Sequence, residues 1–304
     1  MKILITGKTG QLGYALQKRL QDMGEVIALD RSQMDLADLD QVRSVIRAIE
    51  PDLIINPAAY TAVDKAENEQ ALAMRINGEA PGVMAQEAKR LGAAIIHYST
   101  DYVFDGSKGS PYTEDDATGP LSAYGRSKLA GEQAVRESGA NHLILRTSWI
   151  YGAHGNNFLK TVLRLAQARD ELRIVADQHG APTCSASIAD ATACAIDTLG
   201  SPSGFATAGD AWTDAWKQHS GLYHLTAQGE TTWYGFSKAI LDHPSTSRNP
   251  PVVPIATQDY PLPATRPAYS VLSSERFIKT FCALPDWHDA LTLCLDGMAK
   301  DNKQ

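Results

Sequence analysis

The chain has 304 residues, of which 43% are hydrophobic and 21% are charged, so it can bury a large core and a smaller second part. Its formal net charge of -7 argues against nucleic acid as the main partner, because a phosphate backbone requires a basic surface. A small-molecule substrate that carries phosphate can still bind through local arginine and glycine residues.

The four cysteines, Cys184, Cys194, Cys282 and Cys294, lack the C-x-x-C spacing of a zinc site, so buried reduced thiols are expected. No apolar run reaches the roughly 18 residues of a membrane-spanning helix, and no signal-peptide core is visible. We therefore expect a soluble, cytoplasmic protein with no membrane partner.

Residues 2–6 form an apolar run suited to a buried parallel strand, and a turn with Gly7, Gly10 and Gly13 follows directly. A helical pattern over 11–22 comes next. Glycines let the backbone approach a pyrophosphate, and the helix N-terminus offers free N–H groups to the same anion. The G-x-x-G-x-x-G spacing is one residue longer than the G-x-G-x-x-G fingerprint, so it predicts a variant dinucleotide site.

The second predicted strand, residues 25–30, ends at Asp30, 20 residues after Gly10, where an acid that binds the adenosine ribose is expected. Arg31 follows and can pair with a 2′-phosphate. The two neighbours argue for NAD and NADP respectively, so we expect the protein to use both NADH and NADPH. Asp35 is either an adenine contact or the N-cap of a helix predicted over 38–49.

Further strands are predicted at 53–56, 94–100 and 143–148, with helices over 69–91 and 122–138 between them. This alternation predicts an α/β fold of the Rossmann type, with a doubly wound parallel sheet. In such a sheet ligands gather at the carboxyl ends of the strands.

Thr100 ends the fourth predicted strand, and Tyr124 and Lys128 follow it in a Y-x-x-x-K pattern that begins 24 residues later. Residues i and i+4 share one face of a helix. We therefore expect the Lys128 ammonium to lower the pKa of the Tyr124 phenol from about 10 toward working pH, where the phenol can protonate a ketone oxygen. Thr100, Tyr124 and Lys128 are the predicted catalytic residues of a hydride-transfer enzyme.

Beyond residue 150 the pattern changes. Strands are expected at 172–175 and 222–225, and residues 187–193 begin a helix that can return to the first domain. The stretch 201–221, with Trp212 and Trp216, is interpreted as a surface insertion with a short helical piece. We expect a dinucleotide-binding domain of residues 1–150 plus roughly 184–200. An interleaved, smaller substrate domain would hold residues 151–183 and 201–304.

The glycine turn, Thr100 and the Tyr124/Lys128 pair together resemble the extended short-chain dehydrogenase/reductase superfamily, whose members act mostly on nucleotide-linked sugars. Longer strings are similar to the dTDP-4-dehydrorhamnose reductase family. They are GKTGQLG at 7–13, AYTAVDKAE at 59–67, YSTDYVF at 98–104, RTSWIY at 146–151, GNNF at 155–158, DQHGAPT at 177–183 and RP at 266–267. The resemblance covers nearly the whole chain outside 201–221.

The resemblance implies that NADPH or NADH reduces the C4 ketone of dTDP-4-dehydro-β-L-rhamnose to dTDP-β-L-rhamnose, the last step of dTDP-L-rhamnose biosynthesis. The implied cofactor contacts, carried over residue by residue, are Gly10, Gln11, Leu12, Asp30, Asp35, Leu36, Ala59, Tyr60, Thr61, Tyr98, Tyr124 and Lys128. The implied substrate contacts are Thr100, Asp101 and Trp149.

Two of the substrate candidates have alternative interpretations. Trp149 offers a flat face to sugar C–H groups or is a core aromatic, and Arg266 binds the substrate diphosphate or forms a surface salt bridge. Some family members are associated with Mg²⁺ bound by carboxylates. The sequence has no convincing acidic cluster, so no metal ligand is predicted.

Alternative functions share the fold. A nucleotide-sugar 4,6-dehydratase requires a carboxylate where Tyr102 stands, which argues against it. Another nucleotide-sugar 4-ketoreductase or epimerase stays open, as does a non-catalytic regulatory subunit of the methionine adenosyltransferase type. An intact Thr100, Tyr124 and Lys128 argue against a binding-only role. A monomer or homodimer is expected.

Overall fold

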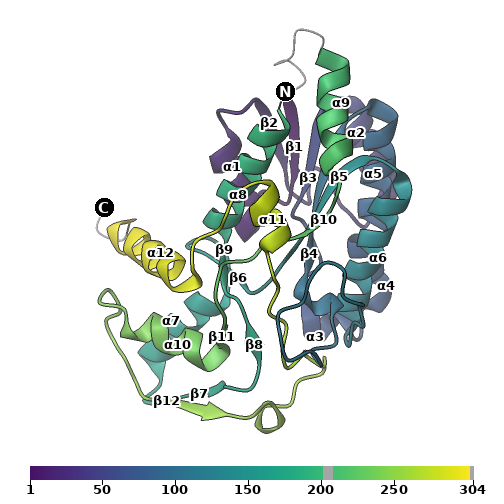
Figure 1. The fold of residues 1–304 in the computed structure, drawn as a ribbon. Helices are drawn as coiled ribbons and strands as arrows, with labels where there is room; N and C mark the ends of the chain where they lie inside the picture. Colours follow the sequence, from purple (N-terminus) through teal and green to yellow (C-terminus); the bar gives the residue numbers. More distant parts are fainter. Residues whose placement is uncertain (201–207, 302–304) are drawn as a thin grey trace.

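A computed structural model of the protein describes residues 1–200 and 208–301 (Figure 1). In that part of the chain, six strands form one parallel sheet in the order β10-β5-β4-β3-β1-β2. The strands are β1 (Lys2–Thr6), β2 (Glu25–Leu29), β3 (Leu53–Asn56), β4 (Ala94–Thr100), β5 (Asn141–Thr147) and β10 (Gly221–His224). The predicted doubly wound parallel sheet is confirmed.

The strand order reverses at β1, which pairs with β2 on one side and β3 on the other. The chain thus winds outward in both directions from the loop that follows β1. Ligands of open α/β sheets bind at such a switch point, at the carboxyl ends of the strands. The glycine turn at residues 7–13 lies there.

Both faces of the sheet are buried because helices pack against each of them, and successive side chains of each strand point to opposite faces. Ile3 and Ile5 pack with α1, α8 and α9 on one face, whereas Leu4 packs with α2 and α5 on the other (Figure 1). The helices that cover the sheet are α1 (Gln11–Leu20), α2 (Leu39–Ile49), α5 (Ala80–Leu91), α6 (Ala123–Ser138), α8 (Ser185–Leu199) and α9 (Ala208–His219).

The helix predicted over 69–91 is interrupted. It consists of α4 (Gln70–Met74), a wider π-helical turn η1 (Arg75–Glu79) and α5, with a short helix α3 (Val63–Ala66) before it. Pro81 lies in the first turn of α5 and has no N–H to donate to the preceding turn. The hydrogen-bond register therefore changes before it, a change that hydrophobic periodicity does not reveal.

The smaller part lies below the carboxyl end of the sheet, at the lower left of Figure 1. Its core joins α7, α10 and α12 with the strand pair β7–β12. The elements are β6 (Ile150–Tyr151), α7 (Phe158–Ala168), β7 (Leu172–Val175), β8 (His179–Gly180), β9 (Thr183–Cys184), β11 (Thr231–Thr232), α10 (Trp233–Asp242), β12 (Val252–Ile255), η4 (Thr257–Asp259) and α12 (Trp287–Asp301).

The segment after residue 200 differs from the prediction. Trp212 and Trp216 lie one turn apart on one face of α9 and are 4% and 0% exposed, so they belong to the core under the sheet. β10 pairs with β5 as an edge strand of the central sheet, although its residues fall in the range assigned to the substrate domain. The helix α11 (Glu275–Thr280) packs on β10. Residues 201–207 of the expected surface insertion lie outside the described residues.

Helix α8 follows the expectation and packs along α1. Within residues 1–200 and 208–301, no helix has both the length and the apolar composition that crossing a membrane requires.

Candidate active site

A cleft of 720 Å³ opens at the carboxyl ends of β1, β3, β4 and β5. It contains many of the residues that the sequence singles out. Those that line it are Gly7, Gly10, Gln11, Leu12, Gly13, Ala59, Thr61, Thr100, Asp101, Tyr124 and Trp149.

The glycine turn forms one wall of the cleft. Gly7 has φ +62°, a left-handed conformation that L side chains rarely adopt, and a Cβ on Gly13 would lie 2.1 Å from the Gly7 carbonyl oxygen. Helix α1 begins at Gln11 with no side-chain cap and no acidic residue in its first turn. Its free N–H groups therefore remain available to an anion, and this wall fits the pyrophosphate of a dinucleotide.

Helix α6 brings Tyr124 to the cleft, whereas Lys128 is 3% exposed and does not line it. The Ser122 hydroxyl accepts from Gly125 N–H at 3.1 Å and caps the helix. A Cβ on Gly125 would lie 2.2 Å from the Tyr102 carbonyl oxygen, so glycine is what lets the first turn of α6 approach the end of β4. Tyr124 thereby lines the same cleft as Thr100.

The expected lowering of the Tyr124 pKa is wrong in direction for this structure. Burial raises the pKa of Tyr124 to about 12, and the interaction with Thr100 lowers it only in part. Lys128 donates instead to the Tyr98 carbonyl oxygen at 2.6 Å, and burial lowers its own pKa to about 8. Sequence spacing places the two residues on one face but does not reveal that Lys128 is buried and Tyr124 half-buried.

The Thr100 hydroxyl accepts from Tyr102 N–H at 3.2 Å and donates to the Asp101 carboxylate at 3.0 Å. The other Asp101 oxygen accepts from the Ser270 hydroxyl at 2.5 Å. Burial raises the pKa of Asp101 to about 6, although both hydrogen bonds oppose that shift. Ser270 comes from the C-terminal segment, 169 residues away in sequence, and no sequence signal marks it.

Two stacked aromatic residues, Trp149 and Trp233, also line the cleft. The indoles of Trp149 and Trp233 lie 3.5 Å apart and within 8° of parallel, and Phe158 packs against Trp233 at 4.5 Å. A Cβ on Gly180 would lie 2.4 Å from the Trp149 ring, so this glycine leaves room for the indole. Trp149 thus lies at the cleft with one face covered by Trp233, a residue that the sequence analysis did not single out.

A second cavity of 730 Å³ adjoins the first, and Trp233 lines both. Arg266 lines the second cavity and forms a two-pronged ion pair with Asp64, at 2.8 and 3.1 Å. Arg266 therefore forms a salt bridge, as one of its two interpretations expected, and its role in substrate binding stays a prediction. Three further arginines in this wall, Arg164, Arg169 and Arg173, make no side-chain hydrogen bond or ion pair with another described residue.

The predicted adenosine contacts lie at the end of β2, outside the 720 Å³ cleft. Asp30 accepts from the Ser32 N–H and hydroxyl, and hydrogen bonds from Ser32 and Lys8 lower its pKa. Arg31 pairs with Asp35 at 3.2 Å. The N-cap of α2 is Asp38, so the capping interpretation of Asp35 is wrong. Leu36 is 6% exposed and packs into the core between the sheet and helices α2 and α5.

Two of the predicted cofactor contacts turn their side chains elsewhere. The Tyr60 hydroxyl donates to Glu69 at 2.7 Å, and the buried Tyr98 hydroxyl bonds Thr192 of α8 at 2.6 Å. The Tyr98 backbone carbonyl is nevertheless the acceptor that holds Lys128.

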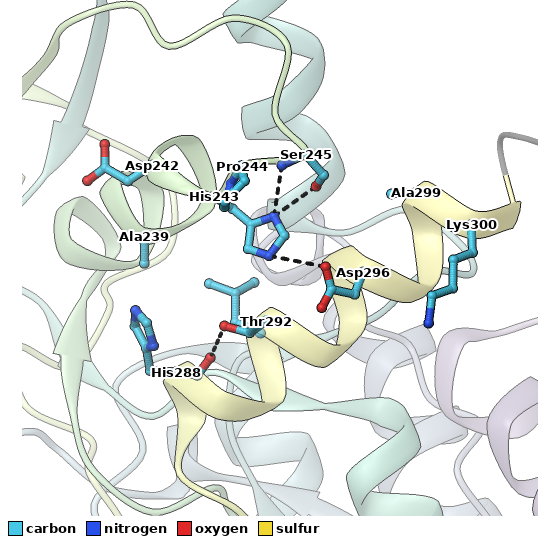
Figure 2. A pocket seen from close by; sticks show the side chains of 11 residues that line it. Ala239, Asp242, His243, Pro244, Ser245, His288, Thr292, Asp296, Ala299 and Lys300 are labelled. Carbon is cyan, nitrogen blue, oxygen red and sulfur yellow. Dashed lines mark hydrogen bonds and ion pairs between the residues drawn. The ribbon is translucent and has the colours of Figure 1, made fainter.

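A cavity of 790 Å³ lies apart from this cleft, between α10 and α12 (Figure 2). His243 bonds the Ser245 hydroxyl at 2.8 Å there and lies 3.7 Å from Asp296. None of the predicted site residues lines it. Within the described chain, no three His, Cys, Asp or Glu side chains gather as a metal site would require.

Comparison with known proteins agrees with this geometry. The family model "RmlD substrate binding domain" matches residues 1–300. A dTDP-4-dehydrorhamnose reductase of Burkholderia thailandensis is 48% identical, over 97% of this chain and 98% of its own length. The corresponding Escherichia coli K12 protein is 44% identical over 94% of each chain.

Solved structures give the same result. A dTDP-4-dehydrorhamnose reductase from Bacillus anthracis, in complex with NADP, superposes with a TM-score of 0.86 at 34% identity, over 97% of this chain and 99% of its own. A UDP-glucose 4-epimerase from Thermus thermophilus shares the fold at 19% identity, with a TM-score of 0.78 over 98% of this chain and 99% of its own. The chain therefore belongs to the dTDP-4-dehydrorhamnose reductase family.

Proposed function

We propose that the protein catalyses the NAD(P)H-dependent reduction of the C4 ketone of dTDP-4-dehydro-β-L-rhamnose to dTDP-β-L-rhamnose, the last step of dTDP-L-rhamnose biosynthesis. The observation that carries this proposal is that Thr100 and Tyr124 line the same cleft as the glycine turn. Family membership over the whole chain supports the same assignment.

In this reaction the cofactor, when bound, supplies a hydride to C4 of the sugar. Tyr124 donates the proton that the ketone oxygen requires, since its raised pKa keeps the phenol protonated at neutral pH. Thr100 orients the same oxygen by turning its hydroxyl from Asp101 toward the ketone. Lys128, held by the Tyr98 carbonyl, places a positive charge beside the site.

The second cavity is the proposed site of the nucleotide diphosphate. Three exposed arginines without a described partner supply charge for two phosphates, and Phe158, Trp233 and Tyr260 supply flat apolar surface for a base. Because Trp233 lines both cavities, a substrate can place its diphosphate in one and its sugar in the other. Arg266 joins this group of arginines if its pairing with Asp64 loosens in the complex.

The test is to incubate the protein with NADPH and the 4-keto substrate and to identify the sugar by NMR. We expect one NADPH consumed per sugar reduced at C4. An isomerised sugar without net cofactor oxidation would show an epimerase instead, and absence of any conversion would favour a binding-only subunit. We propose in addition that the enzyme is cytoplasmic and acts as a monomer or homodimer, and size-exclusion chromatography with light scattering tests its assembly.

A further inference from the structure

Lys8, within the glycine turn, reaches across to the end of the neighbouring strand. Its Nζ donates to Gln33 Oε1 at 2.6 Å and lies 3.2 Å from Asp30 Oδ2. Its backbone N–H donates to the Leu29 carbonyl at 3.1 Å. The backbone of Lys8 therefore ties the glycine turn to β2, and its side chain ties the turn to the segment that follows β2.

The charge of Asp30 makes this contact relevant to cofactor choice. One Asp30 oxygen accepts from the Ser32 N–H at 2.9 Å and hydroxyl at 2.5 Å, and the other faces Lys8. A carboxylate in this position suits the ribose hydroxyls of NADH. It repels the 2′-phosphate of NADPH unless a cation stands between the two anions.

Two cations are near enough to be considered. Arg31 has a side chain that is 76% exposed and is paired with Asp35. Lys8 has a side chain that is 31% exposed, and its ammonium already forms an ion pair with Asp30. Holding a long exposed side chain in place costs conformational entropy, so Lys8 is the better ordered of the two.

We propose that Lys8 determines the use of NADPH by this protein. Its ammonium bridges the Asp30 carboxylate and a 2′-phosphate when NADPH binds, and stays on Asp30 and Gln33 when NADH binds. This inference rests on the proposed binding of a dinucleotide along the glycine turn. Lys8, a residue of the glycine turn itself, would then bind the 2′-phosphate in addition to Arg31, the arginine that follows β2.

The test compares Lys8→Met with Lys18→Met, which removes the same charge from the exposed last turn of α1. Binding of 2′,5′-ADP and of 5′-AMP is measured by calorimetry, and binding of NADPH and NADH by fluorescence titration. Lys8→Met should weaken 2′,5′-ADP and NADPH by roughly 10- to 100-fold, the size of a lost charge-assisted hydrogen bond. Its affinity for 5′-AMP and NADH should change little, Lys18→Met should resemble wild type, and Lys8→Arg should retain NADPH.

Equal losses for the phosphorylated and unphosphorylated ligands would overturn the proposal, because Lys8 would then only brace the turn. Unchanged affinity for 2′,5′-ADP would overturn it as well. If Lys8→Met does not fold, Lys8→Gln is measured in its place, since its amide can still donate to Gln33. A wild-type protein that binds neither fragment would instead overturn the proposed function, and this inference with it.

Discussion

At the scale of single residues, the surroundings of Tyr124 keep its hydroxyl protonated. Burial raises its pKa to about 12, so the donor form predominates across the neutral range. Tyr124→Phe should lower kcat by roughly 10²- to 10⁴-fold, because only general acid catalysis is removed. Affinity for NADPH should stay near that of wild type. Steady-state kinetics and a fluorescence titration measure the two quantities, and a variant that retains nearly full kcat would remove Tyr124 from the mechanism.

The pH dependence should follow Lys128 rather than Tyr124. Burial lowers the pKa of Lys128 to about 8, so its ammonium is present below that pH and is lost as pH rises through it. If reduction needs this charge, kcat/KM should be level near neutral pH and fall above about 8. The profile of kcat/KM reports groups of the free enzyme. In Lys128→Arg the side chain stays charged at all these pH values, so kcat/KM should not fall above about pH 8. A fall that persists in this variant would contradict the assignment to Lys128.

Thr100 offers a test of the sugar site. Thr100→Val keeps the shape of the side chain but removes the hydroxyl that now donates to Asp101. The loss should reduce kcat/KM by an amount equivalent to about 1–3 kcal/mol, while affinity for NADPH hardly moves. Kinetics with the 4-keto sugar and a separate NADPH titration decide this. An unchanged KM for the 4-keto sugar together with weakened NADPH binding would show that Thr100 contacts the cofactor instead.

Sequence motifs predicted the residues of the glycine turn, of the carboxyl end of β4 and of the first turns of α6, because the residues of each motif lie close together along the chain. Lys8, Trp233 and Ser270 were not singled out, since their partners at Asp30, Trp149 and Asp101 meet them only in the folded chain. The direction of the Tyr124 shift was missed for a related reason. A spacing of four residues predicts proximity, whereas burial depends on every element packed around the pair.

At the scale of elements, α6 is fixed to the sheet by a buried ion pair. Arg146 of β5 donates to both oxygens of Glu132 at 2.8 and 2.7 Å, and the two side chains are 3% and 2% exposed. Glu132→Ala leaves the guanidinium buried without its counter-charge, which should lower the free energy of unfolding by about 3–5 kcal/mol.

Urea unfolding measures the stability of Glu132→Ala, and Glu275→Ala serves as the control in which an exposed ion pair is lost. Glu275 pairs with Lys279 on an exposed helix face, with side chains 74% and 75% exposed. Loss of such a pair should change stability by no more than about 1 kcal/mol. Similar midpoints for the two variants would show that the buried pair contributes little.

The elements that the sequence predicted best were the buried strands, because their continuous apolar runs are unambiguous. Composition misled at 201–221, where Gly, Ser, Ala and Thr suggested a surface insertion. Trp212 and Trp216 were the better signal, since their spacing of four places both on the buried face of α9.

At the scale of the whole molecule, the sheet and its cover are completed by segments from the second half of the chain. β10 extends the sheet beside β5, and α8 packs along α1. A fragment of residues 1–150 therefore lacks an edge strand and part of the layer that covers one face. We expect this fragment to show no cooperative thermal transition in circular dichroism, whereas the full chain melts cooperatively. A cooperative melt of the fragment would show that the first 150 residues fold independently.

The stacked indoles of Trp149 and Trp233 give the protein a built-in optical probe. Two identical chromophores 3.5 Å apart and nearly parallel couple electronically, so their combined absorption depends on the angle between them. A sugar that enters the cleft and shifts Trp149 by a few degrees changes this coupling without any added label. Substrate binding can then be followed by ultraviolet circular dichroism, separately from the oxidation of the cofactor, in the unmodified protein.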